Sequence, residues 1–327
     1  MEFTRRKAAL SVAAVMFAAM FTGCGSTSAA EKKEKLSIVC TDFSEYDWTR
    51  NIVGESGNTD ITYLLSSGID IHNYQPSVDD MMTISNCDMF IYVGGESESW
   101  VDDALKSSAN KNMKVIKLFD AVQDSLKEEE LKEGIEEGPE DHIHNEDEPE
   151  YDEHVWLSVR NAQTVCSAIC DDLCELDPAN ADKYRSNLSA YSSELSSLDN
   201  AFSDMAANAS TKTVLFGDRF PFRYLVDDYG IDYYAAFAGC SAESEASFET
   251  VAKLAGKLDE LKLDTVFIIE NSNDSLARSI INNSKNKNAA VEKLNSLQSV
   301  TDSDIAGGAS YISIMQDNLD TLKKVLD

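Results

Sequence analysis

The stretch Met89-Phe90-Ile91-Tyr92-Val93-Gly94-Gly95 is almost entirely apolar and ends at two glycines. A strand that is buried on both faces has this composition, and such strands belong to parallel sheets that helices cover. Residues 265–270 repeat the pattern much later in the chain, as Thr-Val-Phe-Ile-Ile-Glu. The two stretches predict an α/β protein with two lobes.

Strands and helices alternate around both stretches, which is typical of an α/β layer structure. Hydrophobic periodicity predicts strands over 36–40, 61–65, 89–93, 115–118, 213–217, 231–234, 265–270 and 289–291. It predicts helices over 45–53, 78–84, 100–107, 155–176, 179–207, 222–229, 247–261, 276–282 and 311–326. Each lobe is therefore expected to hold a mostly parallel sheet with flanking helices.

The helix over 179–207 is expected to join the two lobes. It follows Asp177-Pro178, where proline occupies the first turn of a new helix. A helix of ~28 residues is ~42 Å long, enough to run along both lobes. The expected domains are an N-terminal lobe over 36–178 with a loop over 124–151, a linking helix over 179–208 and a C-terminal lobe over 209–327.

The N-terminus has the features of a signal peptide over 1–23. A basic start, Arg5-Arg6-Lys7, precedes an apolar run that is too short for a permanent membrane span. The run ends at Phe-Thr-Gly-Cys24, which resembles the lipobox of bacterial lipoproteins. Cys24 is then the lipid attachment point, and 24–35 is a flexible tether at the outer face of the bacterial cytoplasmic membrane. An ordinary secretory signal with an incidental cysteine is the alternative.

The composition argues against nucleic acid as a partner. The chain has 58 Asp and Glu against 28 Lys and Arg, a formal net charge of −30. Such a charge repels phosphate backbones and anionic lipid headgroups, and it attracts cations.

The cysteines that follow Cys24 do not have the spacing of a disulfide framework. They are Cys40, Cys87, Cys166, Cys170, Cys174 and Cys240. The middle three, Cys166, Cys170 and Cys174, recur every four residues and share one stripe of a helix. We interpret this stripe as packing on the inner face of the helix, with a thiolate metal site as the alternative.

The chain has only four histidines, and three of them lie in or against its most acidic stretch, 124–153. These are His142, His144 and His154, while His72 stands alone in Gly-Ile-Asp-Ile-His-Asn-Tyr-Gln-Pro. Imidazole beside carboxylate suits a borderline divalent cation such as zinc. The segment 124–151 is too charged to order itself, so it is expected to be a mobile loop. Its two histidines either capture metal weakly or are simply solvated.

Four landmarks occur in an order and spacing that identify a family. They are His-Asn-Tyr-Gln-Pro from His72, Glu-His-Val-Trp-Leu around His154, Leu-Asp-Pro-Ala-Asn-Ala over 176–181 and Tyr-Ile-Ser-Ile-Met-Gln-Asp-Asn-Leu over 311–319. Together they resemble the zinc- and manganese-binding substrate proteins of bacterial ABC importers. The resemblance implies two α/β lobes joined by a rigid helix, one metal buried in the cleft between them, and delivery of that metal to a membrane permease.

The resemblance assigns the metal ligands only in part. It places the first two family ligands on His72 and His154. The third, usually His or Glu, falls on Arg219, and the fourth, usually Asp, falls on Gln298. Arginine cannot ligate, because it stays protonated, so Arg219 is expected to pair with a carboxylate instead. The candidates for completing the site are Asp218, Glu270, Asp302, His142 and His144.

Three other functions compete with zinc uptake. Manganese is the alternative cargo, because more carboxylate in the ligand set would favour it. A surface adhesin or metallochaperone is a second alternative. A zinc hydrolase is a third, but the sequence has no His-Glu-x-x-His and no nucleophile elbow, so no enzymatic activity is expected. The protein is expected to be a monomer.

Overall fold

The computed structural model describes residues 35–55, 57–130, 132, 151–241 and 246–327. The predicted signal peptide with Cys24 lies outside these residues, and so do His142 and His144. No helix among the described residues is both long and apolar enough to cross a bilayer.

The first half of the chain forms a four-stranded, all-parallel sheet in the order β2-β1-β3-β4. Its strands are β1 (Leu36–Cys40), β2 (Thr59–Tyr63), β3 (Met89–Tyr92) and β4 (Lys114–Lys117). Its helices are α1 (Phe43–Val53), α2 (Val78–Asn86), α3 (Val101–Ser107) and α4 (Leu118–Ala121), with short 3-10 turns η1 (Ile71–Asn73), η2 (Glu96–Glu98) and η3 (Gln123–Ser125). All four residues of β3 are buried, as its apolar sequence predicts.

The second half repeats this plan, with a parallel sheet in the order β6-β5-β7-β8. Its strands are β5 (Thr213–Phe220), β6 (Asp232–Ala238), β7 (Thr265–Ile269) and β8 (Ala290–Leu294). Its helices are α7 (Arg223–Tyr229), α8 (Phe248–Glu260), α9 (Ser275–Asn283), α10 (Asp302–Ala306) and α11 (Tyr311–Leu326). The α/β prediction with two parallel sheets is confirmed.

Strand β6 is longer than its local sequence predicts. Alanine is depleted in strands, so the sequence Ala-Ala-Phe-Ala after 234 gave no strand signal. In the structure this stretch pairs with the end of β5, where Arg219 lies opposite Phe237 and Phe220 opposite Ala238. Pairing with a neighbour therefore extends β6 and carries the chain toward Gly239 and Cys240.

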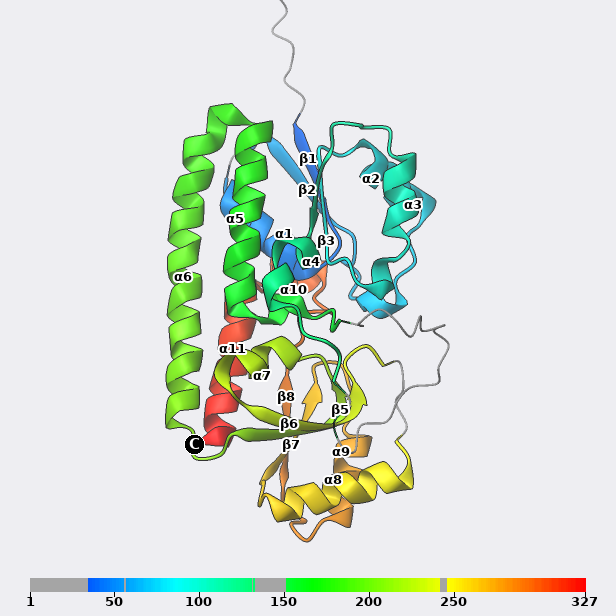
Figure 1. The fold of residues 1–327 in the computed structure, drawn as a ribbon, viewed down its shortest axis with the longest axis vertical. Coiled ribbons are helices and arrows are strands. Elements are labelled where there is room, and N and C mark those ends of the chain that lie inside the picture. Colours follow the sequence, from blue (N-terminus) through cyan, green and yellow to red (C-terminus); the bar gives the residue numbers. More distant parts are fainter. Residues whose placement is uncertain (1–34, 56, 131, 133–150, 242–245) are drawn as a thin grey trace, which may run out of the picture. The chain divides into compact units, whose positions relative to one another are not determined.

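Two helices connect the halves (Figure 1). Helix α5 (Val159–Leu176) ends at Asp177, a 3-10 turn (Pro178–Asn180) follows, and α6 (Ala181–Asn208) begins. The Asp177 carboxylate accepts hydrogen bonds from the Asn180 amide at 2.6 Å and the Tyr184 hydroxyl at 3.1 Å, which stabilises the break. Helix α6 packs against α1 and α5, and it also packs against α11, the last helix of the chain.

The stripe of cysteines on α5 is part of the core, as predicted. Cys166 and Cys170 are buried in the main hydrophobic cluster, and Cys174 is partly buried against it.

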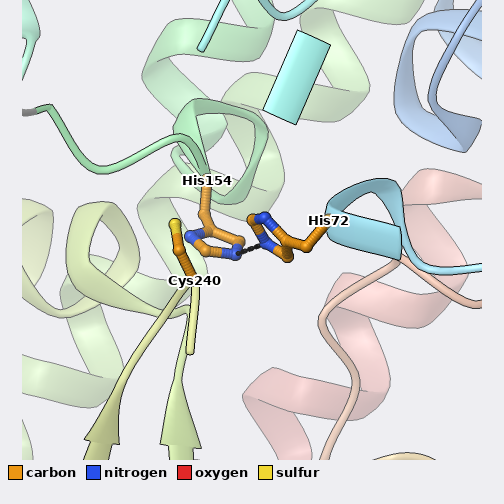
Figure 2. A group of neighbouring side chains, drawn as sticks. All are labelled: His72, His154 and Cys240. Carbon is orange, nitrogen blue, oxygen red and sulfur yellow. Dashed lines mark hydrogen bonds between the residues drawn. The ribbon is translucent and has the colours of Figure 1, made fainter. Parts of the chain in front are cut away.

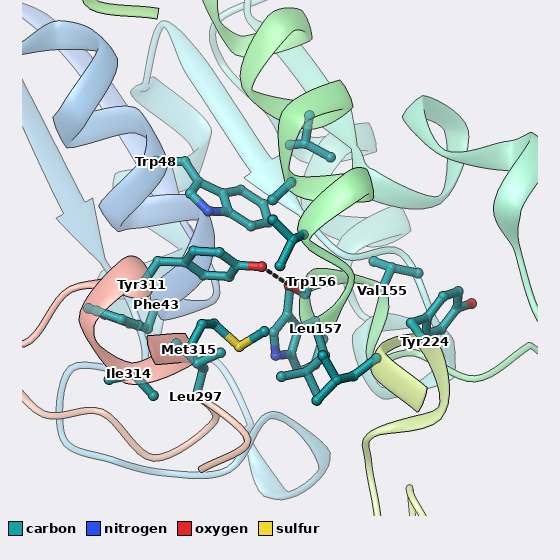
Figure 3. Packing of buried hydrophobic residues seen from close by; sticks show 14 of the residues in the cluster. Phe43, Trp48, Val155, Trp156, Leu157, Tyr224, Leu297, Tyr311, Ile314 and Met315 are labelled. Atoms are coloured by element: carbon teal, nitrogen blue, oxygen red, sulfur yellow. Dashed lines mark hydrogen bonds between the residues drawn. The ribbon is translucent and has the colours of Figure 1, made fainter. Parts of the chain in front are cut away.

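An aromatic cluster ties the segment that follows His154 to both halves of the chain (Figure 3). The Trp156 side chain is fully buried, and its indole N–H donates to the Ser296 carbonyl at 2.9 Å. The Tyr311 hydroxyl of α11 donates to the Trp156 carbonyl at 2.8 Å, and the Tyr311 ring meets Trp48 of α1 edge-on. The prediction that Trp156 belongs to the core is confirmed.

Candidate metal centre

His72 and His154 face one another across the site (Figure 2). His72 lies in η1 after β2, and His154 lies just before η4 (Val155–Leu157), the short turn that leads into α5. Their Nε2 atoms are 3.2 Å apart. Two Zn–N bonds of ~2.0–2.1 Å at a tetrahedral angle would place two nitrogens about 3.3 Å apart. The structure therefore brings the two predicted histidines together at a spacing that fits one metal ion.

Asp152 holds the His154 ring from behind. Its Oδ1 accepts a hydrogen bond from His154 Nδ1 at 2.9 Å and another from the His154 backbone N–H at 2.9 Å. The Asp152 carbonyl also accepts a bond from the Tyr224 hydroxyl at 2.8 Å. When Nδ1–H donates its hydrogen bond to a carboxylate, the Nε2 lone pair is free and faces the site, as in metal-binding histidines generally.

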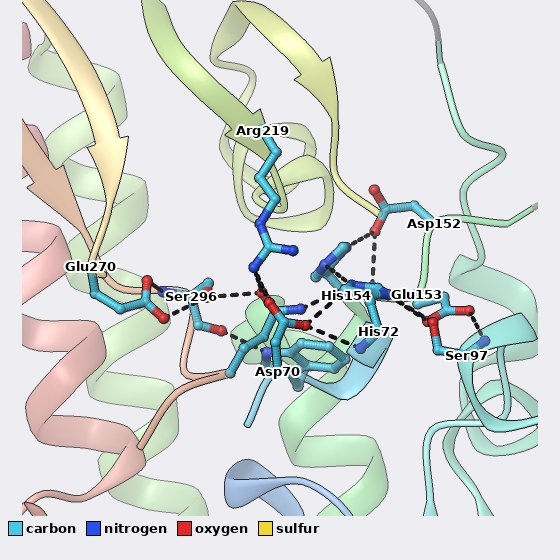
Figure 4. Close-up of polar contacts among 11 residues, drawn as sticks. Asp70, His72, Ser97, Asp152, Glu153, His154, Arg219, Glu270 and Ser296 are labelled. Carbon is cyan, nitrogen blue, oxygen red and sulfur yellow. Dashed lines mark hydrogen bonds and ion pairs between the residues drawn. The ribbon is translucent and has the colours of Figure 1, made fainter. Parts of the chain in front are cut away.

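Ser97 and Glu153 hold the His72 ring in a similar way (Figure 4). His72 Nδ1 lies 2.7 Å from Ser97 Oγ and 3.5 Å from Glu153 Oε2, and Glu153 Oε1 accepts the Ser97 backbone N–H at 2.8 Å. Burial, together with nearby His154, lowers the pKa of His72 to about 3. The ring is therefore neutral at physiological pH, which is the form that binds a metal.

Arg219 pairs with a carboxylate, as its sequence position predicts. Its Nη2 forms an ion pair with Asp70 Oδ2, and Asp70 Oδ1 accepts the His72 backbone N–H at 3.1 Å. Arg219 thus steadies the turn that carries His72. Gln298 lies beside this pair, with its Nε2 3.1 Å from His72 Nε2 and its Oε1 3.5 Å from Arg219 Nη2.

The structure brings a third potential ligand to the histidines, Cys240. The ligand atoms of His72, His154 and Cys240 all lie within 4.8 Å of one another, and the described residues contain no other such group of His, Cys, Asp or Glu. Burial raises the pKa of the Cys240 thiol, and the carboxylates of Glu153 and Asp152 raise it further. The sequence predicts no role for Cys240, because no motif surrounds it and β6 extends to Ala238, beyond the strand predicted over 231–234.

The two carboxylates proposed as further ligands bond to backbone elsewhere. Asp218 Oδ2 accepts the Ile269 N–H at 3.0 Å, which ties β5 to β7. Glu270 accepts the Ser296 N–H at 2.9 Å and the Ser296 hydroxyl at 2.8 Å. Neither carboxylate belongs to the group around His72, and Asp302, exposed at the start of α10, does not either.

Three buried carboxylates, Glu98, Asp42 and Glu45, lie near the turn that carries Ser97. Glu98 is almost fully buried, its Oε2 accepts the Gly94 N–H at 2.7 Å, and its Oε1 has no hydrogen-bond partner among the described residues. Asp42 and Glu45, which cap α1, are buried nearby. Burial, with a smaller contribution from Glu153 and Asp42, raises the pKa of Glu98 to about 7.

We expect Glu98→Gln to stabilise the metal-free protein at pH 8. The folded state binds a proton at Glu98 near pH 7, whereas an unfolded glutamate does so near pH ~4.3. The folded wild type therefore gains stability as the pH falls from 8 to 5, because protonation removes the buried charge. The amide of glutamine carries no charge and keeps an oxygen for the Gly94 N–H. The expected gain at pH 8 is about 2 kcal/mol, since burying the amide offsets part of the benefit.

Urea unfolding of both proteins at pH 8 and pH 5 measures this effect. The difference between wild type and Glu98→Gln should shrink toward zero at pH 5. A difference that is equal at both pH values would show that folding does not raise the pKa of Glu98.

Comparison with known proteins places the chain among zinc-uptake components. A family model described as zinc-uptake complex component A, periplasmic (ZnuA), matches residues 38–325. The zinc-binding lipoprotein AdcA of Streptococcus pneumoniae is 32% identical over 316 residues, which cover 96% of this chain and 60% of AdcA. The high-affinity zinc uptake system protein ZnuA of Bacillus subtilis is 30% identical over 313 residues, which cover 94% of each chain.

A solved structure shares the fold. The crystal structure of the Zn(II)-bound ZnuA-like domain of S. pneumoniae AdcA superposes with a TM-score of 0.70 at 28% identity, and the match covers 90% of this chain and 99% of that domain. The chain spans about 60% of the full length of AdcA.

Proposed function

The chain belongs to the zinc-uptake complex component A (ZnuA) family, and on that premise we propose that it is a lipid-anchored, extracytoplasmic protein that captures zinc and delivers it to a membrane ABC importer. The family is one of transport components and not of enzymes. The observation that carries the proposal is the pair of His72 and His154 Nε2 atoms, which face one another 3.2 Å apart. Zinc is then the cargo and not a resident cofactor.

The chemistry around the pair supports zinc. Both imidazoles present Nε2 to the site while their Nδ1 atoms bond to Asp152 and Ser97. Such bonding fixes ring orientation and makes the free nitrogen a better ligand. Imidazole nitrogen suits zinc, whereas manganese prefers carboxylate, carbonyl and water oxygens. The relatives AdcA and ZnuA carry zinc in their names, which agrees with this assignment.

The N-terminus and the family support the proposed anchoring and delivery. The Phe-Thr-Gly-Cys24 sequence and the lipoprotein name of AdcA support a lipid on Cys24. A protein held at the outer face of the membrane keeps its zinc close to the permease that receives it. We propose that it acts there as a monomer.

Binding and release require the site to open. The His154 side chain is fully buried, and the His72 side chain is only 8% exposed. His72 and Ser97 follow strands of the first sheet, whereas Gln298 and Cys240 follow strands of the second. We propose that the two sheets, with their helices, separate slightly to admit and to release the ion.

Titration of the purified protein with zinc and with manganese tests the proposal. One tight zinc site per chain, with weaker manganese binding, is the expected result. A protein that binds neither ion tightly would refute the function.

The segment 133–150, which holds His142 and His144, is proposed to collect zinc without forming part of the tight site. The predicted loop, 124–151, also includes residues 124–130 and 151, and these are held in place by contacts with the rest of the protein. Lys127 donates its N–H to the Tyr224 hydroxyl at 3.1 Å, and Glu128 pairs with Tyr151. A clean deletion therefore has to spare these residues.

Replacing 133–150 by a Gly-Ser linker of ~8 residues should leave tight zinc affinity within about twofold and lower the number of weak sites. It should also slow zinc capture at low salt, because exposed charges raise the local cation concentration and are screened over ~8 Å at physiological ionic strength. Calorimetry and stopped-flow mixing measure the two effects. The double variant His142→Ala/His144→Ala serves as the control that keeps the acidic charge. A loss of tight affinity in either variant would mean that a loop histidine is a ligand.

A further inference from the structure

The structure points to Cys240 as a ligand of the bound metal. We propose that Cys240 Sγ binds zinc together with His72 and His154 Nε2, and that this thiolate gives the site its preference for zinc over manganese. The inference rests on the proposed function, because it concerns the same site. Cys240 would supply a third ligand, which the two histidines alone do not provide.

The positions that family resemblance offers for further ligands are occupied by other groups. Arg219 is a permanent cation, and it is committed to the ion pair with Asp70. Gln298 turns its amide nitrogen, a donor, toward His72 at 3.1 Å. Neither side chain supplies an anionic ligand, so the negative charge that zinc needs has to come from another residue.

The fold delivers Cys240 to the site through the extended strand β6 and Gly239. Residue 239 lies so close to His154 that a Cβ there would be 2.9 Å from His154 Cε1 and 2.9 Å from the Phe220 carbonyl oxygen. Only glycine permits this approach without moving the ring or the β5 backbone. The residue that follows, Cys240, is thereby placed beside the His154 ring, with its sulfur within 4.8 Å of a ligand atom of each histidine (Figure 2).

The distances require only a small contraction to bind zinc. A Zn–S bond of ~2.3 Å and a Zn–N bond of ~2.0 Å at a tetrahedral angle separate sulfur and nitrogen by about 3.6 Å. The three ligand atoms lie within 4.8 Å of one another in the described protein. Binding zinc therefore requires the ligand atoms to approach one another by up to about 1.2 Å. The fourth position of a tetrahedral site is left to water or to a further oxygen.

The charges around the group are compatible with a thiolate ligand. Two neutral imidazoles leave both positive charges of the ion uncompensated, and a thiolate cancels one of them. Asp152, behind His154, and Glu153, beside His72, oppose a thiolate at Cys240 in the metal-free protein, and the two positive charges of the ion offset that repulsion. Glu129 is a third carboxylate near Cys240, and Asp70, beside His72, is already balanced by Arg219.

A thiolate also sets the selectivity. Sulfur is a soft ligand that suits zinc and cadmium, whereas manganese prefers hard oxygen ligands. A site with two nitrogens and one sulfur therefore disfavours manganese more strongly than a site completed by a carboxylate. Cys240 would then decide between zinc and manganese.

Cobalt spectroscopy tests the ligand directly. Co²⁺ substitutes for zinc, and a thiolate ligand gives an intense near-ultraviolet sulfur-to-cobalt charge-transfer band. The wild-type protein, kept under a phosphine reductant and titrated with Co²⁺ alone, should show this band. Cys240→Ser should bind without it. Cys174→Ser should retain it, because Cys174 is also partly buried but lies on α5 outside the metal group.

Zinc and manganese affinities test the consequence. Cys240→Ser should weaken zinc binding by about tenfold or more and change manganese binding much less, so the zinc-to-manganese ratio should fall. Near-ultraviolet circular dichroism of the metal-free variants checks that they fold. A wild-type protein that binds cobalt and zinc tightly without a thiolate band would refute Cys240 alone. A wild-type protein that binds neither ion would refute the proposed function as well.

Discussion

His154→Ala should abolish tight zinc binding, with a loss in affinity well above 100-fold. Residues that merely support a metal ligand typically contribute 10–100-fold, and removing the ligand itself costs more. In this variant the Asp152 Oδ1 atom keeps its hydrogen bond from the backbone N–H of residue 154 but loses the ring N–H that it orients. His72→Ala should have an effect of similar size, because the two Nε2 atoms face the same point.

Asp152→Asn is the matched control for these variants. It keeps both imidazole rings but offers a weaker, neutral acceptor to His154 Nδ1, so the expected loss is about 10–100-fold. Calorimetry with a competing chelator ranks the proteins, and circular dichroism confirms that each is folded. Wild-type affinity in both alanine variants would exclude the histidine pair as the binding site.

Trp156→Ala should destabilise the protein by about 3–5 kcal/mol, the cost of removing a fully buried large side chain. The substitution leaves a cavity between α1, α11 and the turn after His154. It also leaves the Ser296 carbonyl without its indole partner. The ring of Trp156 lies 5.2 Å from the ring of His154, so the loss of packing should weaken zinc binding too.

Trp100→Ala provides the comparison. Trp100 is only partly buried and meets Tyr74 edge-on. Its removal should cost about 1–2 kcal/mol, because a partly exposed ring loses less apolar contact with the protein. Urea unfolding of the metal-free proteins measures both values. Equal losses for the two variants would mean that the Trp156 cluster does not hold the halves of the chain together.

The sequence predicted most of the secondary structure because the signals are local. Strand β1 and helix α11 begin and end at the predicted residues. The end of α7 was also predicted, since Gly230 adopts the left-handed conformation that glycine tolerates. In each case the residues that define the element are neighbours along the chain. Helix α10 was missed because its five residues are too few for a helical period to be read.

The histidines of the candidate site were predicted by residue type and by motif. Four histidines in 327 residues, with one in each of two distinctive motifs, left few other candidates for a metal ligand. The role of Arg219 was predicted as well, because a permanent cation at a ligand position needs a carboxylate partner. Which carboxylate it would be was not predictable: Asp70 and Arg219 are far apart in sequence, and only the folded chain brings them together.

By itself, the sequence determined the α/β class, the two sheets, the break before α6 and the two histidines, because each depends on composition or on periodicity within a short window. Only the tertiary structure decided that Cys240 joins His72 and His154 while Asp218 and Glu270 bond to backbone. That choice depends on how far β6 pairs with β5 and on how closely Gly239 approaches His154, and both are contacts between distant segments. Hydrophobic periodicity records which face of an element is buried, but it does not record which element lies opposite.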